Sequence, residues 1–101
     1  MGQRAMETFR SCIPLFQALS DPARQDIILL LAEKERLSVN EIAEHSRLSR
    51  PAISHHLKIM RETGLVALER QGTQRYYFLS LVPSLEKMKE LIRLVEEECL
   101  S

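Results

Sequence analysis

The sequence predicts a mainly α-helical domain that carries one small β-hairpin. Over most of the chain, apolar residues recur every three or four positions, which is the period of an α-helix with one buried face. Between residues 65 and 80 the pattern instead alternates on either side of Gly72-Thr73, which is typical of two short antiparallel strands joined by a tight turn. A chain of 101 residues is expected to form a single domain, residues 1–101.

The first 35 residues are expected to form two helices. The apolar stripe that predicts the first helix consists of Ala5, Phe9, Cys12, Phe16 and Leu19. Pro14 either kinks this helix or delays its start to about Ser11, because proline removes a backbone donor. Asp21 and Pro22 predict the start of the second helix, since Asp accepts hydrogen bonds at a cap and Pro suits the first helical position. From there to about Glu35 the run IILLL is apolar on every side, which predicts the central buried helix.

Residues 38–64 predict two short helices joined by a tight polar turn. Ser38 and Glu41 match a capping box, which predicts a helix from about Val39 to His45. After a turn at residues 46–48, Ser49 is expected to cap a second helix that ends at Gly64 in the left-handed conformation. The expected buried face of this second helix consists of Ile53, Leu57 and Met60. Two helices in this order form a helix-turn-helix, and the hairpin at 65–80 that follows it is predicted to be a wing.

Residues 82–101 are expected to form the last helix. Its apolar stripe, with alternating spacings of four and three, consists of Leu81, Leu85, Met88, Ile92, Val95 and Cys99. Such a narrow stripe usually faces another helix, and a chain of this length is marginal as a monomer. We therefore expect a homodimer in which segments 1–20 and 82–101 pair the two subunits. The residues expected at its interface are Phe9, Phe16, Leu85, Met88, Ile92 and Val95.

The distribution of charge indicates a nucleic-acid partner that the total charge conceals. The formal net charge is zero, which alone would argue against DNA. Residues 47–75, however, carry six cationic side chains and two glutamates, a net charge of +4 that the rest of the chain balances. A basic centre within a winged helix-turn-helix predicts a gene regulator that binds double-stranded DNA.

Composition excludes several other classes of protein. No apolar run approaches the roughly 18 residues of a membrane helix, and the N-terminal segment lacks the pattern of a secretory signal, so we expect a cytoplasmic protein. Cys12 and Cys99 lie far in sequence from the histidines, so no nucleophile falls beside a base and an enzyme is not predicted. Neither a cofactor nor a bound metal is expected.

The expected DNA contacts fall into two groups. Side chains near the start of the second helix of a helix-turn-helix reach base edges in the major groove. The residues expected to bind DNA there are Ser49, Arg50, Pro51, Ser54, His55 and Lys58. The wing residues expected to contact phosphates or the minor groove are Arg70, Gln71, Thr73, Gln74 and Arg75. Arg50 is the candidate for reading guanine, with a phosphate contact as the open alternative.

Three aromatic residues of this region have structural interpretations beside the functional one. His56 points to a different side of the helix from His55, so we expect it to be partly buried and bonded to backbone. A metal site made of these two histidines is disfavoured, because consecutive helical residues diverge by about 100°. Tyr76 and Tyr77 face opposite sides of their strand, so one is expected to pack on the core and the other to contact a phosphate. The sequence does not decide which.

Three segments closely resemble the ArsR/SmtB family over roughly residues 13–81. They are FQALSDPARQDIILLL, LSRPAISHHLKIMRETGLV and the wing RQGTQRYYFLS. The resemblance implies a small homodimeric winged-helix repressor that binds operator DNA and releases it when a metal or another signal arrives. It also implies that Ser54 and His55 occupy DNA-contact positions.

Metal sites common in that family are missing from this sequence. Residues 39–43, VNEIA, contain no cysteine where thiolate-binding members carry a Cys-x-Cys motif. Residues 82–101 contain no Asp and no His, so the zinc ligands found on the last helix of other members are also missing. The resemblance thus predicts operator binding, while the inducer remains unknown and the choice between repression and activation stays open.

Two alternatives to this interpretation concern the cysteines and the partner of the expected DNA-binding surface. Cys12 and Cys99 are expected to be small buried hydrophobes. The alternative is a redox-responsive repressor, in which the two thiols approach each other at the dimer interface with Cα atoms no more than about 7 Å apart. The second alternative is a winged helix used for protein contact, which would not show the steep salt dependence of DNA binding.

Overall fold

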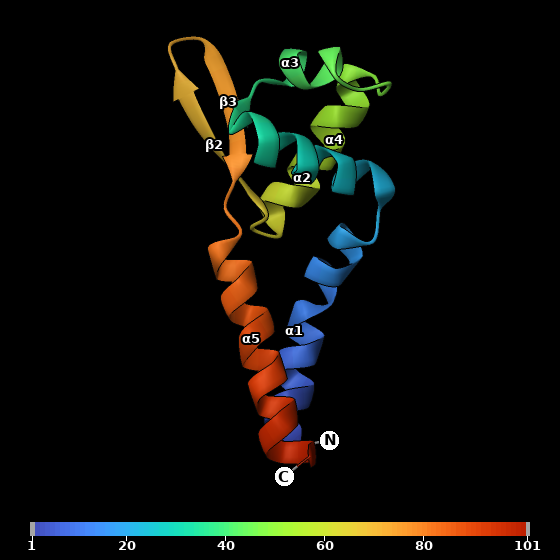
Figure 1. Ribbon diagram of the computed structural model, residues 1–101, viewed down its shortest axis with the longest axis vertical. Helices are drawn as coiled ribbons and strands as arrows, with labels where there is room; N and C mark the ends of the chain where they lie inside the picture. The colour runs from blue at the N-terminus through green and yellow to red at the C-terminus, as the bar shows by residue number, and fades with distance from the viewer. Residues whose placement is uncertain (1, 101) are drawn as a thin grey trace.

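The computed structural model describes residues 2–100 as a head and a stalk (Figure 1). The elements are α1 (Gln3–Leu19), α2 (Pro22–Lys34), β1 (Arg36–Leu37), α3 (Val39–Glu44), α4 (Arg50–Glu62), β2 (Val66–Gln71), β3 (Gln74–Leu79), α5 (Val82–Val95) and a π-helical turn (Glu96–Leu100). The head contains α2, α3, α4 and the sheet, whereas α1 and α5 form the stalk of a molecule that measures 50 × 25 × 20 Å. This architecture confirms the predicted mainly helical fold with a wing. Across residues 2–100, no helix combines the length and hydropathy that a membrane crossing requires.

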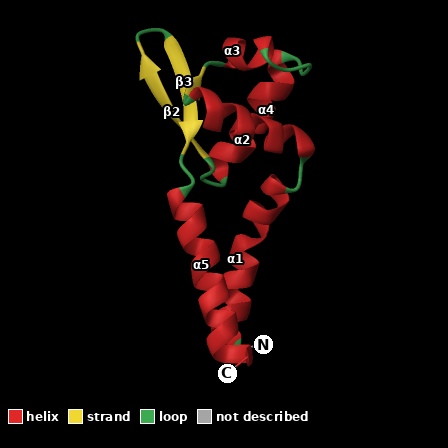
Figure 2. Ribbon diagram, in the orientation of Figure 1, coloured by secondary structure: helices red, strands yellow, loops and turns green. Residues whose placement is uncertain are grey.

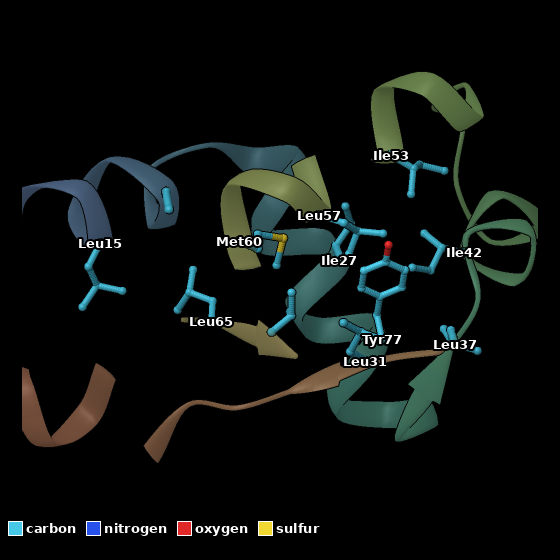
Figure 3. Packing of buried hydrophobic residues seen from close by; sticks show 12 residues of the cluster. Leu15, Ile27, Leu31, Leu37, Ile42, Ile53, Leu57, Met60, Leu65 and Tyr77 are labelled. Carbon is cyan, nitrogen blue, oxygen red and sulfur yellow. The ribbon is translucent and has the colours of Figure 1, made fainter. Parts of the chain in front are cut away.

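The hydrophobic core lies between α2, α3, α4 and the sheet, and the last turns of α1 extend it with Leu15 and Ala18 (Figure 3). The predicted apolar face of α4 is confirmed, because Ile53, Leu57 and Met60 are all fully buried. Tyr77 of β3 and Leu65 close the core from the side of the sheet. Burial of each large aliphatic side chain contributes about 1.5–3 kcal/mol, so this face anchors α4 and leaves the opposite face to solvent.

Helix α2 is buried on one side only, which corrects the prediction of a helix that is apolar and buried all round. Ile27 and Leu31 are buried, but Leu29 is 68% exposed. Leu29 stands at an open hollow of about 590 Å³ between α2 and the turn that joins α3 to α4. Five consecutive apolar residues carry no periodicity, so only packing against α4 and the sheet selects the buried side.

The wing belongs to a three-stranded antiparallel sheet with strand order β1-β3-β2, whereas the sequence predicted only a hairpin (Figure 2). The predicted hairpin is confirmed, with Gly72 at φ 60° in its two-residue turn. The missed strand β1 pairs Arg36 with Phe78 and Leu37 with Tyr77. A strand of two residues has no alternation to detect, but it supports β3 from the side opposite β2.

Local signals set the ends of the helices in the head as predicted. The side chain of Asp21 accepts hydrogen bonds from the backbone N–H groups of Ala23 and Arg24 at 2.7 and 3.2 Å. Ser38 and Glu41 form both bonds of the capping box, and α3 ends at Glu44, one residue earlier than expected. The hydroxyl of Ser49 caps α4, and Gly64 follows that helix at φ 80°.

Of the two alternatives that Pro14 left open, a start delayed to about Ser11 is wrong, because α1 runs without a break from Gln3 to Leu19 (Figure 1). Pro14 lies inside the helix on an exposed side. The carbonyl that loses its N–H partner to proline is therefore accessible to water, which keeps the cost of this residue low.

Helices α1 and α5 run antiparallel and bring both ends of the described chain together (Figure 2). At the far end of the stalk, the backbone N–H of Ala5 donates to Oε1 of Glu98 at 3.0 Å. Nearer the head, Nζ of Lys87 donates to the carbonyl of Ser11 at 2.7 Å. Ala5 and Cys12 are fully buried in this pairing, so the expectation of a buried Cys12 is confirmed.

The α5 stripe predicted to face another helix is not the one that packs on α1. Leu91 and Leu94 are buried within the chain, whereas Leu85 and Ile92 are 44% and 58% exposed. Of the six residues expected at a dimer interface, Phe9, Leu85 and Ile92 are exposed, and Phe16, Met88 and Val95 are half-buried. Cys99 is also exposed, which contradicts its interpretation as a buried hydrophobe. The stalk therefore presents an apolar face that nothing within residues 2–100 covers.

Candidate nucleic-acid interface

The exposed face of α4 carries the residues predicted to reach DNA. Those residues are Ser49, Arg50, Pro51, Ser54, His55 and Lys58, and all six are exposed. They lie opposite the buried face, because the apolar side of α4 is fixed in the core. The start of α4 and the turn of the wing lie at the same outer end of the head (Figure 1). One flat partner can therefore touch both elements at once.

The wing brings two arginines directly opposite each other. The β2–β3 register pairs Arg70 with Arg75, and Gln71 with Gln74, next to the turn that contains Thr73. All five side chains are exposed. Like charges on directly opposite positions of two strands repel each other, so this arrangement is stabilised when an anion binds between them.

Within residues 2–100, the cations at this end of the head are unpaired, in contrast to Arg4, Lys89 and Arg93 of the stalk. Arg50, Lys58 and the two wing arginines form no ion pair within residues 2–100. In the stalk, by comparison, the Arg93 guanidinium contacts Glu90 and Glu97 at 2.6 and 2.8 Å. The hydrogen bond from Arg93 holds the pKa of Glu90 below its ordinary value. Positive charge that is free to meet phosphate is thus concentrated on α4 and the wing.

Arg36 of β1 braces the wing, a role that the sequence did not suggest. Its guanidinium contacts the Glu69 carboxylate at 3.2 Å and donates to Oε1 of Gln71 at 2.9 Å. It also stacks over the ring of Tyr76, 4.4 Å from the ring centroid. These contacts fix the outer face of the wing, and they engage the carbonyl oxygen of Gln71, which was predicted as a DNA contact. Its amide nitrogen stays available.

A groove of about 250 Å³ separates α4, the recognition helix of the helix-turn-helix, from the wing. It is lined by Ser38, Val39, Asn40, Ser54, Thr73, Gln74, Arg75 and Tyr77. The structure therefore brings the predicted residues Ser54, Thr73, Gln74 and Arg75 to one place. Asn40 and Tyr77 were not among the predicted contacts. Asn40 lies two residues after the capping Ser38, so the sequence indicates only that it belongs to the start of a helix. The alternation of the strand indicates only that Tyr77 is a candidate core residue.

Tyr76 and Tyr77 face opposite sides of β3, as the alternation of the strand predicted. Tyr77 is 8% exposed and packs in the core, while Tyr76 is half-buried under Arg36 on the outer face of the wing. The structure thus decides which tyrosine faces the core. The prediction that the other one contacts a phosphate stays untested.

His56 is half-buried as expected, but its partner is a side chain rather than backbone. Its Nδ1 lies 3.2 Å from Nη1 of Arg24 on α2, which corrects the prediction. Arg24 also donates from Nε to the carbonyl of Ala18 at 2.8 Å, at the end of α1. One guanidinium therefore links the stalk helix α1, the start of α2 and the recognition helix α4. A contact between residues 32 positions apart leaves no signal in the sequence pattern.

The N-cap of α2 belongs to the same cluster. The backbone N–H of Arg24 is the main cause that lowers the pKa of Asp21, with further contributions from the N–H of Ala23 and the charges of Arg24 and His56. Partial burial opposes this shift. The carboxylate therefore stays ionised beside Arg24, at 3.7 Å from Nη1, and holds the guanidinium in place.

The free cysteines Cys12 and Cys99 lie at different levels of the stalk. Cys99 adjoins Glu98, which contacts Ala5, whereas Cys12 lies seven residues further along α1, about 10 Å at the rise of a helix. That separation does not fit a disulfide within one chain. Among residues 2–100, no three His, Cys, Asp or Glu side chains are grouped as a metal site would require.

Sequence comparison relates the chain to transcriptional regulators. A family model described as "Bacterial regulatory protein, arsR family" matches residues 21–67. An HTH-type transcriptional regulator of Methanocaldococcus jannaschii is 35% identical over 92 residues, which cover 91% of this chain and 99% of the relative. The transcriptional repressor SdpR of Bacillus subtilis is 39% identical over 65% of this chain and 72% of its own. An arsenical resistance operon repressor of the same organism is 30% identical over 79% and 76%.

Solved structures agree with this relationship. An ArsR-like transcriptional regulator from Rhodococcus sp. RHA1 superposes with a TM-score of 0.80 at 27% identity, covering 91% of this chain and 84% of that one. NolR from Sinorhizobium fredii superposes with a TM-score of 0.74 at 28% identity, covering 97% and 94%. The similarity thus extends beyond the helix-turn-helix to the stalk helices.

Proposed function

The chain belongs to the ArsR family of bacterial regulatory proteins, which are DNA-binding transcriptional regulators rather than enzymes, and we propose that it is a homodimeric repressor that binds duplex operator DNA. The observation that carries the proposal is the set of unpaired cations that α4 and the wing present at one end of the head. The direction of regulation is supported by relatives named as repressors, among them SdpR.

In this proposal α4 enters the major groove and the wing follows the adjacent minor groove. Arg50 lies in the first turn of α4, where side chains of recognition helices reach base edges. Its guanidinium donates a bidentate pair of hydrogen bonds to a guanine. Arg70 and Arg75 lie opposite each other at the tip of the wing, where their positive charges suit the narrow, negative minor groove. Ser54, His55 and Lys58 complete the contact along the exposed side of α4.

The dimer in this proposal forms through the uncovered apolar face of the stalk. Phe9 and Ile13 of α1 lie exposed together with Leu85 and Ile92 of α5. Large apolar side chains exposed on two helices that pack together favour a protein contact, and a second copy of the same stalk would bury them symmetrically. Two heads would then present two recognition helices to successive turns of one duplex.

Replacement of Arg50 tests the DNA-reading role. Arg50→Ala should lower affinity for an operator, selected from a random duplex library with the wild-type protein, by about 1–3 kcal/mol, roughly 5- to 150-fold. Affinity for unrelated duplex should change much less. Lys34→Ala, which removes an exposed cation at the end of α2, is the matched control and should bind normally. Equal weakening on both duplexes would make Arg50 a phosphate anchor.

Salt dependence separates DNA binding from protein binding by the same face. The logarithm of the association constant should fall steeply with the logarithm of salt concentration, because each phosphate contact releases counterions. Wild-type protein that ignores duplex DNA at low salt would refute the proposed function in favour of a protein-interaction module.

A charge placed on the stalk tests the dimer. Ile92→Asp should shift the protein from dimer to monomer in sedimentation velocity and weaken operator binding, because a carboxylate cannot be buried cheaply in an apolar interface. Leu29→Asp is a matched control, since Leu29 is equally apolar and even more exposed but lies on the head. A dimer that survives Ile92→Asp would refute the assigned interface.

We propose further that the releasing signal is not a metal held at the thiolate or last-helix sites of the family. Residues 39–43 contain no cysteine, and residues 82–101 contain neither Asp nor His. Zinc or a chelator should therefore leave operator affinity unchanged. Oxidation tests the redox alternative. A loss of affinity that Cys99→Ser abolishes, together with a disulfide-linked dimer in non-reducing electrophoresis, would assign the signal to a disulfide between subunits, because the two thiols of one chain lie too far apart.

A further inference from the structure

We propose that the groove between α3, α4 and the wing binds one phosphodiester group of the DNA backbone, with the hydroxyl of Tyr77 and the side-chain amide of Asn40 as donors. This inference rests on the proposed function and adds two contacts outside the exposed face of α4 and the wing tip. It also assigns a binding role to the tyrosine that packs in the core, Tyr77, rather than only to its half-buried neighbour Tyr76.

Tyr77 is a buried residue whose hydroxyl group is not hydrogen-bonded within residues 2–100. The residue is 8% exposed, and its hydroxyl points from β3 toward Ile42 and Ile53 of the helices (Figure 3). No described residue forms a hydrogen bond with this hydroxyl, and yet it is not sealed from solvent, because Tyr77 lines the groove. A phenolic hydroxyl that reaches solvent in this way can donate one hydrogen bond to a group that arrives from outside. The hydroxyl is thus placed to donate to a group that enters the groove from outside.

The chemistry of the groove selects an anion. No carboxylate is among the residues that line the groove, and five of them have side chains with N–H or O–H donors: Asn40, Ser54, Thr73, Gln74 and Arg75. The nearby carboxylate of Glu41 is held away, since it accepts the backbone N–H of Ser38 at 3.0 Å as part of the capping box. Several neutral donors around one arginine recognise a phosphate by hydrogen bonds as well as by charge.

The position of the groove favours a DNA phosphate over a free anion. A recognition helix in the major groove and a wing in the adjacent minor groove are separated by one sugar-phosphate strand. The space between α4 and the wing is therefore where that strand must pass. A volume of about 250 Å³ exceeds the needs of a single small anion and leaves room for the sugars attached to the phosphate. The groove is also open to solvent, so a continuous strand can lie across it.

Tyr77→Phe tests the inference by removal of one oxygen atom. We expect operator affinity to fall about tenfold, because a hydrogen bond to a charged group is lost, and affinity for unrelated duplex to fall by a similar factor. Lys34→Ala, at the exposed end of α2 and outside the proposed interface, is the control and should bind as the wild type does. Asn40→Ala, at an exposed position, should weaken binding in the same sequence-independent way without a risk to folding. Thermal unfolding of each variant checks the fold.

Methylphosphonate substitution then locates the phosphate. Neutral linkages are placed one at a time along the operator, and binding is measured for wild-type, Tyr77→Phe and Asn40→Ala proteins. One position should weaken the wild type strongly and both variants much less, because the variants have already lost that contact. Equal sensitivity of all three proteins at every position would overturn the inference.

The outcomes distinguish this inference from the function on which it rests. If wild-type protein binds duplex but Tyr77→Phe and Asn40→Ala bind equally well, the phosphate site is refuted and the proposed function stands. If wild-type protein binds no duplex, both fail. A third arm titrates inorganic phosphate alone, followed by NMR of the Tyr77 ring. Millimolar phosphate binding that Asn40→Ala abolishes, with DNA affinity unchanged, would assign the groove to a small anion instead and overturn the inference.

Discussion

Arg24 holds the head on the stalk, and its replacement should weaken both the fold and the attachment of the recognition helix. Its side chain is 12% exposed. Nε donates to the carbonyl of Ala18 at 2.8 Å, Nη2 donates to that of Gln17 at 3.2 Å, and Nη1 lies 3.2 Å from Nδ1 of His56. These two carbonyl groups lie in the last turn of α1, where the helix dipole favours a cation. Arg24→Ala removes all of these contacts at once.

The size of the effect follows from the burial of each contact. A hydrogen bond from a charged group contributes about 1.5–3 kcal/mol to stability. The contacts with Ala18 and His56 are partly buried, whereas the contact with Gln17 is exposed to solvent and contributes little. Two bonds at the lower end of the range give a loss of about 3 kcal/mol in the free energy of unfolding. In a domain of this size that corresponds to a fall in Tm of roughly 12 °C or more.

Urea unfolding followed by circular dichroism measures this loss. All variants must be compared at one protein concentration, because dimerisation makes the apparent stability depend on it. Arg47→Ala is the control, since Arg47 is exposed and forms no ion pair within residues 2–100, and it should change stability by less than about 0.5 kcal/mol. A loss below about 1 kcal/mol for Arg24→Ala would show that the cluster does not join the head to the stalk.

Three further predictions concern the head. Leu57→Ala should lower the free energy of unfolding by about 2–5 kcal/mol, because Leu57 is fully buried and leaves a cavity; a smaller loss in urea unfolding would contradict its central place in the core. Gly64→Ala should cost about 1–2 kcal/mol in the same assay, since φ is 80° there, and an unchanged stability would argue against that conformation. The pKa of Asp21 is lowered in the folded protein, so its carboxylate stabilises the fold above its ordinary pKa, and that contribution is lost as the pH falls through the lowered pKa. Asp21→Asn should therefore lose less stability than the wild type between neutral pH and about pH 3, and parallel curves would refute this.

Sequence patterns were reliable wherever the determining interactions are local. The capping box at Ser38 and the caps at Asp21 and Ser49 join residues two or three positions apart, so the motif contains both partners of each bond. The period of α4 likewise specified its buried and exposed faces before any partner was known. The predicted DNA contacts on α4 and the wing are accordingly exposed at one end of the head.

Patterns failed where local periodicity is absent or ambiguous. The run IILLL presents apolar groups on every side, and the exposure of Leu29 follows only from what packs against α2. In α5 two apolar rows lie side by side, and the chain buries Leu91 and Leu94 while it leaves Leu85 and Ile92 uncovered. The two residues of β1 form a strand only because β3 provides the partner.

By itself, then, the sequence determined the helices, their caps, the wing and the polar face of the recognition helix, because those features depend on neighbours within about one turn of chain. Tertiary structure alone decided that Arg24 meets His56, that Arg36 braces the wing, and that Asn40 and Tyr77 face one groove. Each of these contacts joins residues 30 or more positions apart, with the partners brought together by burial of the core rather than by any local rule.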